Sequence, residues 1–596
     1  MNKRIVAVIV SALMAAVLLS ACAAGSSAGT SASASIEKKA VPARIQMGKN
    51  LPITDSEVSL YFVNGGDIPY VALSEYLPIV GSIYEDADLG ISAVEYEISR
   101  PGEGHVWVKR ADNEAVMDID PAKDTIEFLG MNQFVATPGS SSLLAIISMG
   151  ESGTGGHSNL LQDDGSSYER ASFDNTTLDL SEYEIDLIDQ DGECYVPLQT
   201  VSDLLVSRTY LYVVYNGEKL IIAPHQSELI DEMYEAETGP MSEDFAKFNY
   251  NELRFLLDYF YGLKPEHDID NFGDFFLSTG LWSDLSGTDP KAFDDALRML
   301  TLKYFDDGHS GLLKESYLAG KADLDDTEAS LENLKAIGTS MSESTWSGFA
   351  RKEKRAEHYP DHPDLAGLTE DAEQPWFYEE VGDTAIITFD EFSAKKKDYY
   401  TEADLKNPQD TIELISYAQS QITRENSPIK NVVLDLSCNG GGDADAAVFT
   451  IAWFKSFGKV ALRDTLTGAQ SVCSYAADVN LDKQFDDLDA LPAEVNRYCI
   501  ISGSSFSCGN LVPAAFKDSD SVTLLGVTSG GGTCAVLPCT TASGAIFAIS
   551  GTYQISTVKN GSFYNIDRGV EPDFVVKNMD ILYDRTRLVE YIHGLQ

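Results

Sequence analysis

Hydrophobic and polar positions change their spacing along the chain, and the changes mark out its parts. Residues 45–225 contain short apolar runs broken by Gly, Asp and Asn, which predicts a β-rich domain. In residues 226–375 apolar positions recur every three or four residues, which predicts a helical subdomain. Strand-like runs alternate with helical segments in residues 376–580, a pattern typical of βαβ units around a largely parallel sheet. Residues 581–596 are expected to form a C-terminal helix or tail.

Two segments of the β-rich part resemble each other. Residues 68–77 and 194–204 each predict a strand, a tight turn and a short helix. The second is followed by apolar residues 211–215, the pair Asn216-Gly217 and apolar residues 220–222, which predicts a hairpin. These segments resemble the small β/α modules found beside copper amine oxidases and in surface proteins of Gram-positive bacteria. That resemblance carries no chemistry.

The N-terminus has the layout of a secretory signal peptide. Lys3 and Arg4 precede an apolar stretch over residues 5–19, and Leu-Ser-Ala then leads to Cys22. This end of the stretch resembles a bacterial lipobox, which implies that Cys22 is lipidated and that residues 1–22 are the signal. An ordinary signal peptide or an anchor helix is the alternative. Residues 23–44, which start rich in Ala, Gly, Ser and Thr, are expected to be a flexible spacer. We therefore expect an exported protein, anchored by lipid on the extracellular side of the cell membrane.

Charge and composition exclude some classes of partner. The formal net charge is −50, from 93 acidic and 43 basic residues, and such a surface repels nucleic acid. The hydrophobic content of 44% is that of a globular chain. Eight cysteines are present; if Cys22 carries lipid, seven remain and at least one thiol is unpaired. Cys534 and Cys539 are close enough in sequence to pair across a short loop, and no C-x-x-C motif indicates zinc. No metal or organic cofactor is indicated, and the oligomeric state stays open.

Three loci have residues suited to chemistry, and each has a simpler explanation. Residues 504–510 place Ser507 between a buried strand and a helix, where a nucleophile meets the N–H groups of the first helical turn, although Ser505 or Ser507 could instead cap the helix. Residues 434–442 run from a strand into three glycines, which suit either an anion-binding backbone or a tight turn. His309 lies in a turn flanked by glycine, where a lone surface histidine is the alternative.

Together these loci resemble, in chain order, the tail-specific (C-terminal-processing) serine peptidases, a family that includes the tricorn core and retinoid-binding relatives. The matching pieces are Asp307-Gly308-His309, Leu434-Asp435-Leu436 with Asn439-Gly440-Gly441-Gly442, the serine-rich junction at Ser507, Leu525-Gly526-Val527-Thr528, and Arg568-Gly569-Val570-Glu571-Pro572-Asp573. The resemblance covers roughly residues 240–580. It implies an α/β fold with a C-terminal ClpP/crotonase-like peptidase domain and a helical subdomain.

The sequence departs from the Ser–Lys members of the family at two positions. Their lysine base is replaced by Gly531, and the glutamate three residues after the nucleophile is replaced by Asn510. Both features resemble the Ser–His–acid branch, which includes secreted chlamydial proteases. That branch implies Ser507 as nucleophile and His309 as general base, a role suited to an imidazole with a pKa of about 6.5.

The remaining roles are predicted less directly. We favour Asp567 as the acid that orients His309, although it is offset by one position from where the branch places a glutamate, and Glu571 is the alternative. Gly441 and the N–H of Cys508 are the predicted oxyanion donors.

The leading hypothesis is therefore a cell-surface serine endopeptidase that hydrolyses exported polypeptides through an acyl-enzyme. A non-catalytic peptide- or ligand-binding lipoprotein with the same fold is the alternative. In a third hypothesis, residues 45–225 attach the protein to wall polymer.

Overall fold

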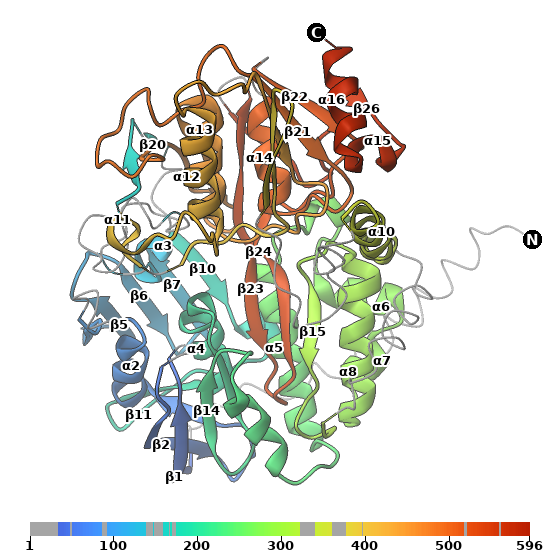
Figure 1. Cartoon of the computed structure of the whole chain (residues 1–596). Coiled ribbons are helices and arrows are strands. Elements are labelled where there is room, and N and C mark those ends of the chain that lie inside the picture. The colour runs from blue at the N-terminus through green and yellow to red at the C-terminus, as the bar shows by residue number, and fades with distance from the viewer. Residues whose placement is uncertain are drawn as a thin grey trace, which may run out of the picture.

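The computed structural model describes residues 34–47, 51–85, 92–136, 138, 147, 159–165, 167–169, 175–321, 340–359, 377–395, 397–517, 521–559 and 562–595. The predicted signal, Cys22 and the first part of the predicted spacer lie outside these residues. In Figure 1 the N-terminal half forms the lower part of the molecule, and the C-terminal sheet with its helices forms the upper part.

A seven-stranded sheet organises the N-terminal domain in the order β11-β12-β3-β2-β1-β14-β13. Its strands are β1 (Ile36–Ile45), β2 (Thr54–Val63), β3 (Tyr70–Ala72), β11 (Ile188–Gln190), β12 (Glu193–Pro197), β13 (Tyr212–Tyr215) and β14 (Leu220–Ala223). The two similar segments are confirmed as strand-helix units, because β3 leads into α2 (Leu73–Ser82) and β12 into α4 (Leu198–Leu205). Strands β3 and β12 pair antiparallel, so the two units lie next to each other.

The predicted flexible spacer is wrong for its last nine residues. Strand β1 begins at Ile36 and pairs with β2 along its whole length and with β14 at its end. Val41, Ala43 and Ile45 are buried, which is the period-two pattern of a strand. The charged residues at the start of β1 and the proline inside it hide this pattern in the sequence.

A second sheet in this half has the order β10-β7-β6-β5-β4. Its strands are β4 (Tyr96–Gly102), β5 (His105–Arg110), β6 (Val116–Asp120), β7 (Thr125–Leu129) and β10 (Asn175–Asp179), and α3 (Met131–Phe134) follows β7. Both sheets pack into one hydrophobic core with the helical subdomain.

The helical subdomain forms as predicted from its apolar spacing. Helix α5 (Glu243–Phe260) is capped by Ser242, and α8 (Pro290–Met299) is capped by Asp289 with proline at its first position. Between them lie α6 (Phe272–Thr279) and α7 (Trp282–Leu285). A π-helical turn, η5 (Leu300–Phe305), continues α8 toward His309, and α10 (Ser340–Ala356) comes later in the chain.

The predicted parallel sheet is confirmed in the C-terminal half. Its order is β16-β17-β18-β21-β22-β26, and only the edge strand β16 is antiparallel among these described strands. The strands are β16 (Phe377–Val381), β17 (Thr384–Thr388), β18 (Asn431–Asp435), β21 (Asn496–Ile501), β22 (Val522–Gly526) and β26 (Phe574–Val575). The side chains of alternate positions on β18 enter different cores: Val432 and Leu434 in one, Val433 in the other.

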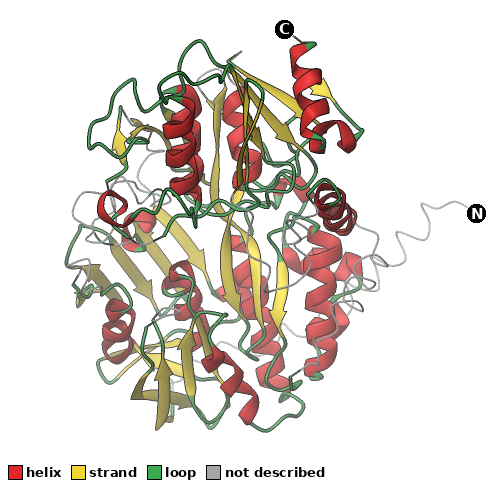
Figure 2. Cartoon of the chain, in the orientation of Figure 1, coloured by secondary structure: helices red, strands yellow, loops and turns green. Residues whose placement is uncertain are grey.

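Helices cover both faces of this sheet (Figure 2). One core contains residues of α12 (Thr411–Ile422), α13 (Ala444–Lys455) and α14 (Cys508–Lys517). The other contains residues of α15 (Met579–Tyr583) and α16 (Arg585–His593), so the C-terminal segment is a helix that belongs to the domain core.

A fourth sheet connects the two halves. It has the order β15-β24-β19-β20-β8, and β23, β25 and β9 join its sides. The strands are β8 (Leu161–Asp163), β9 (Ser167–Glu169), β15 (Gly311–Lys314), β19 (Gly458–Asp464), β20 (Gln470–Ala477), β23 (Cys534–Thr540), β24 (Ile546–Lys559) and β25 (Ser562–Tyr564). Strands β8 and β9 come from the N-terminal half, while β15 directly follows His309. The hairpin β23–β24 runs from the upper part of Figure 1 into the lower part.

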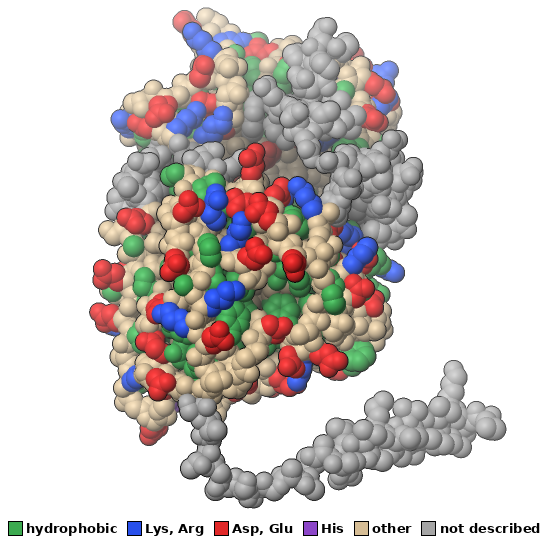
Figure 3. Space-filling view, turned by 90° about the horizontal axis from the view of Figure 1, so that it is seen from below, with side chains coloured by type: hydrophobic (Ala, Val, Ile, Leu, Met, Phe, Trp, Pro, Cys, Tyr) green, Lys and Arg blue, Asp and Glu red, His purple; other side chains and the backbone are tan. Residues whose placement is uncertain are grey.

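The described residues show the surface charges, the hydropathy of the helices and the state of the cysteines. Figure 3 shows one face on which acidic and basic side chains are interspersed. No helix in the described ranges is long and apolar enough to cross a membrane. The seven cysteines from Cys194 to Cys539 are free and buried. The suggested Cys534–Cys539 pair is therefore not formed, because both residues belong to one extended strand, β23.

Candidate active site

Ser507 occupies the junction between β21 and α14, immediately before the first residue of the helix. Its φ of 55° places a non-glycine residue in the left-handed region, which is uncommon and costs about 1–2 kcal/mol. The Ser507 N–H donates to Gly531 O (2.9 Å), and its carbonyl accepts from Asn510 N–H and Leu511 N–H. The backbone at Ser507 is therefore held in a strained conformation from both sides.

The neighbouring Ser505 has a structural role. It is fully buried, its hydroxyl donates to Leu436 O (2.7 Å), and it accepts from Ser502 N–H (2.9 Å). Ser507 Oγ has no hydrogen-bond partner among the described residues and lines a cavity. Of the two serines considered as helix caps, Ser507 is thus the one whose hydroxyl is available for chemistry.

The triple-glycine turn after β18 lies directly against Ser507. A Cβ placed on Gly441 would lie 2.6 Å from Ser507 Cβ and 3.1 Å from its Oγ, so only glycine fits there. The Gly441 N–H, predicted as an oxyanion donor, donates to Asn439 Oδ1 at 3.0 Å in this structure. The N–H of Cys508, the other predicted donor, belongs to the first turn of α14, where N–H groups have no partner inside the helix.

His309 lines the same cavity as Ser507. Its imidazole packs against the ring of Phe506 with the ring centres 4.7 Å apart. Burial lowers the pKa of His309 from the ordinary value of 6.5, and the negative charge of Asp307 opposes that effect. The imidazole Nδ1 is buried and has no hydrogen-bond partner among the described residues.

Asp307 is a residue whose role the sequence analysis missed. Its Oδ1 accepts the backbone N–H groups of His309 (3.1 Å) and Ser310 (2.8 Å), while Oδ2 accepts the hydroxyls of Ser310 (2.8 Å) and Tyr261 (3.0 Å). An aspartate whose side chain accepts the backbone N–H two residues later forms an Asx-turn, and an aspartate in a loop is a known sequence signal for this turn. Asp307 therefore fixes the backbone that carries His309.

Asp567, the predicted orienting acid, is not bonded to His309. Its Oδ1 accepts the N–H of Thr533 (3.3 Å), and burial raises its pKa above the ordinary value. The carboxylate whose charge acts on His309 is that of Asp307. The alternative acid, Glu571, is exposed. The structure thus brings Ser507 and His309 to one cavity, while the acid role of Asp567 stays a prediction.

The position of the missing lysine base has no room for a side chain. Gly531 has a φ of 86°, and a Cβ there would lie 1.9 Å from the carbonyl oxygen of Asp567. Asn510, which replaces the usual glutamate, donates to Ile566 O (2.9 Å) and accepts from Ser529 Oγ (2.6 Å). Gly531 and Asn510, the two departures from the Ser–Lys pattern, therefore each fit the packing around them.

The cavity at Ser507 has a volume of about 420 Å³, and the N-terminal half supplies part of its wall. Arg208 and Tyr210 follow helix α4 of the second strand-helix unit, and Val135 and Ala136 follow α3. The lining also includes Asp443 and residues of strand β23. The sequence analysis did not place any N-terminal residue at the site, because no local pattern reports a contact between residues so far apart in the chain.

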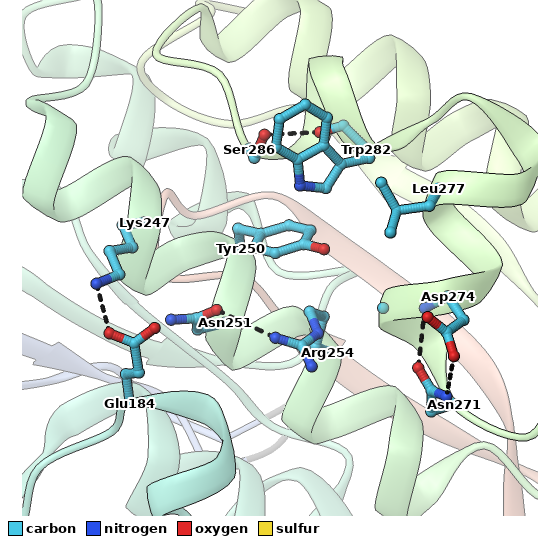
Figure 4. A pocket seen from close by; sticks show the side chains of 11 residues that line it. Glu184, Lys247, Tyr250, Asn251, Arg254, Asn271, Asp274, Leu277, Trp282 and Ser286 are labelled. Atoms are coloured by element: carbon cyan, nitrogen blue, oxygen red, sulfur yellow. Dashed lines mark hydrogen bonds and ion pairs between the residues drawn. The ribbon is translucent and has the colours of Figure 1, made fainter. Parts of the chain in front are cut away.

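A second cavity, of about 480 Å³, lies on the helical subdomain. Figure 4 shows Tyr250 and Trp282 near its centre, with Arg254 below them and the Lys247–Glu184 ion pair at one side. It contains neither a histidine nor a cysteine, and its serine, Ser286, donates to Trp282 O within a helical turn. The cavity at Ser507 is therefore the candidate active site.

Comparison with known proteins agrees with this site. Residues 383–576 match the model of Peptidase family S41, and they include Gly441, Ser507 and Asp567. This part of the chain is an S41 peptidase domain. A search of curated proteins found no match. His309 and the N-terminal wall of the cavity lie outside the matched residues.

Solved structures with similarity to this chain include the following three. A lipoprotein from Streptococcus agalactiae is 15% identical, with 59% of this chain and 97% of that chain covered and a TM-score of 0.34. Mature CPAF in complex with lactacystin is 12% identical, with coverages of 59% and 99% and a TM-score of 0.37. The photosystem II D1 C-terminal processing protease is 17% identical with a TM-score of 0.26; the alignment covers 35% of this chain and 46% of that protease.

Proposed function

We propose that this protein is a serine endopeptidase that hydrolyses exported polypeptides through an acyl-enzyme on Ser507, with His309 as the general base. The observation that carries the proposal is the cavity that Ser507 and His309 line together within an S41 peptidase fold. A serine hydroxyl without a protein partner beside an imidazole is the arrangement that nucleophilic acyl transfer requires.

The reaction would start with transfer of the Ser507 Oγ proton to the imidazole as Oγ attacks the substrate carbonyl. Because Nδ1 of His309 is buried, Nε2 would be the ring nitrogen that accepts this proton. The oxyanion would accept hydrogen bonds from backbone N–H groups at the start of α14, including that of Cys508. The imidazolium would then protonate the leaving amine, and a water molecule deprotonated by His309 would release the acyl group.

The low pKa of His309 supports the base role. A base must be neutral to accept a proton, and burial keeps the imidazole neutral at pH 7. Glycine at position 531 supports the Ser–His arrangement over Ser–Lys, because no lysine is present there and no side chain fits.

The proposal is tested by labelling the full-length chain with a fluorophosphonate probe and identifying the modified residue by mass spectrometry. We expect labelling of Ser507 in the wild type and none in Ser507→Ala, and a fall of several orders of magnitude in His309→Ala. Ser504→Ala is the matched control, because Ser504 lies in the same turn and its hydroxyl accepts from Arg351 (2.7 Å). A folded wild type that is not labelled would contradict the proposal.

The alternative function is a peptide- or ligand-binding protein that keeps the peptidase fold. One observation favours it: Nδ1 of His309 lacks a carboxylate partner among the described residues. The labelling experiment separates the two functions, because a binder needs no activated serine.

We further propose that the protein is exported and held on the outer side of the cell membrane by lipid on Cys22. The basic start, the apolar stretch and the position of Cys22 support this location. Incorporation of labelled palmitate into the wild type and its loss in Cys22→Ser, with release of the protein from the membrane fraction, is the expected result. Equal incorporation in both would contradict it.

A further inference from the structure

We propose that Arg208 is the binding group for a carboxylate of the substrate, so that the enzyme selects peptides that carry a negative charge near the scissile bond. This inference rests on the proposed function and adds a substrate class to it. The carboxylate can belong to an Asp or Glu side chain or to a peptide C-terminus.

Arg208 is held in the wall of the cavity that contains Ser507. It lies in the 3-10 turn η2 (Ser207–Thr209) that follows α4, and it lines the cavity. Its guanidinium carbon lies 4.4 Å from the ring centre of Tyr553 and 5.9 Å from that of Phe260. Stacking on two rings restricts the guanidinium, so a ligand would meet a positioned group rather than a mobile side chain.

Among the described residues, the guanidinium of Arg208 has no anionic partner. No carboxylate of the described residues forms an ion pair with it, and its Nη2 is buried without a hydrogen bond. Arg208 as a whole is partly buried, but a buried N–H donor without a partner is costly, and proteins normally provide one.

Three buried arginines of the described residues are paired with carboxylates, whereas the partly buried Arg351 and Arg497 bond only hydroxyls and backbone carbonyls. Arg110 bonds Asp112 and backbone carbonyls, Arg355 bonds both oxygens of Asp390, and Arg585 bonds Asp435 and Glu379. Arg208 differs from them in facing the candidate active site. Its missing partner is therefore expected to arrive with the substrate.

The other charged residue of the cavity wall does not satisfy Arg208. Asp443 Oδ2 accepts the backbone N–H of Ala394 (2.8 Å), and no ion pair joins Asp443 to Arg208 among the described residues. Tyr210, two residues after Arg208, is exposed and lines the same wall. The cavity wall thus presents the guanidinium of Arg208, the phenol of Tyr210 and strand β23 to a peptide, together with the carboxyl of Asp443, which is bonded to the backbone.

The test is digestion of a mixed peptide library by the full-length chain, with the cleavage sites read by mass spectrometry. We expect Asp or Glu to be enriched at one fixed position relative to the scissile bond, or cleavage at a fixed distance from a free C-terminus. Synthetic pairs with Glu against Gln, and with a free against an amidated C-terminus, identify which carboxylate is bound.

Substitutions of Arg208 test its role by comparing kcat/KM for acidic and neutral peptides. Arg208→Gln should lower kcat/KM for the acidic peptide by about 10- to 100-fold and leave that for its neutral partner nearly unchanged, as expected for loss of a charged hydrogen bond. Arg208→Glu should favour a basic residue at that position. Arg100→Gln is the control for net charge, because Arg100 pairs with Asp189 and is not part of the cavity wall.

Different results would overturn carboxylate binding by Arg208 and the proposed peptidase function. Absence of Ser507 labelling in a folded wild type overturns the proposed function. Peptide selection on immobilised Ser507→Ala protein then still tests the inference, since enrichment of acidic peptides that Arg208→Gln abolishes would support it. Cleavage without preference for a carboxylate, or a preference that persists in Arg208→Gln, would overturn the inference alone.

Discussion

Tyr261 donates a hydrogen bond to Asp307 Oδ2 (3.0 Å), and Oδ1 of the same carboxylate accepts the backbone N–H of His309 (3.1 Å). The ring of Tyr261 stacks on Phe305 at the end of the π-helical turn, with ring centres 4.0 Å apart. Tyr261 therefore connects the helical subdomain to the turn that carries His309, the proposed general base.

Replacing Tyr261 by Phe should lower activity through His309 while keeping the stack on Phe305. We expect kcat/KM to fall by roughly 3- to 30-fold and the free energy of unfolding by about 1 kcal/mol, the usual contribution of one hydrogen bond. Tyr378→Phe, which removes a hydroxyl bonded to Glu380, is the matched control for loss of a hydroxyl. Unchanged activity in Tyr261→Phe would show that this connection does not position the base.

The role of Asp567 can be decided by comparing two isosteric variants. If Asp567 orients His309 during catalysis, Asp567→Asn should lower kcat/KM by about 10- to 10⁴-fold, and Glu571→Gln should have no effect. The opposite result would assign the acid to Glu571. If neither variant loses activity, Asp307 is the carboxylate that acts on His309, in agreement with the electrostatics of the structure.

The pH dependence of labelling follows from the lowered pKa of His309. The imidazole must be neutral to act as a base, so activity is lost when the pH falls through its folded pKa. Because that pKa lies below 6.5, the midpoint of the loss of fluorophosphonate labelling should also lie below pH 6.5. A midpoint above 7 would contradict the effect of burial.

Much of the peptidase domain could be predicted from the sequence because its signals are local. The apolar runs at residues 385–389 and 432–436 predict strands, and residues 444–457 predict a helix; β17, β18 and α13 occur within one or two residues of these bounds. Asn407-Pro408 is a sequence signal for the start of a helix, with Asn as the N-cap and Pro at the first position. The structure differs: helix α12 begins at Thr411, because the Asp410 side chain caps it by accepting the N–H of Glu413 (2.9 Å). Two capping signals lay close together there, and only the tertiary structure selects one.

The sequence predicts the site residues that lie in turns with a clear local pattern. It does not predict those that reach the site through long-range packing. Ser507 and His309 lie in glycine-rich turns, and each has a recognisable local pattern. Arg208 and Tyr210 enter the cavity because β23 contacts the turn that contains Arg208, and such a contact leaves no trace in spacing. The same packing argues against treating residues 45–225 as a separate attachment module, since β8 and β9 complete a sheet with β20.

Substitution of Gly531 tests whether this loop excludes a side chain. Gly531→Ala should cost about 1 kcal/mol for its left-handed backbone, and more because its Cβ would overlap the Asp567 carbonyl. Gly217→Ala is the matched control: Gly217 has a φ of 88° and no atom within 4 Å of the added Cβ. Differential scanning calorimetry should show a larger loss of Tm for Gly531→Ala than for Gly217→Ala. A lysine introduced by Gly531→Lys should not restore activity to a chain that lacks His309. Equal losses at the two positions would contradict the steric argument.

Two buried carboxyls between the N-terminal half and the helical subdomain should make stability depend on pH. Asp203 on α4 accepts from Gln199 Nε2 (2.9 Å), Glu252 on α5 accepts from Thr200 Oγ1 (2.9 Å), and one oxygen of each has no partner among the described residues. Burial raises the pKa of both carboxyls, and the charge of Asp203 further raises that of Glu252.

A raised folded pKa means that the folded chain keeps protons that the unfolded chain releases above about pH 4. The folded chain is therefore most stable, with respect to these two carboxyls, below about pH 4. That stability is lost as the pH rises toward the pKa values of the carboxyls in the folded chain. Asp203→Asn should therefore raise the free energy of unfolding at pH 8 relative to wild type by on the order of 1–3 kcal/mol, with little gain at pH 4. Urea unfolding at the two pH values measures this difference, with the exposed Asp270→Asn as control. A gain that is the same at both pH values would mean that Asp203 is ionised in the folded chain throughout this range.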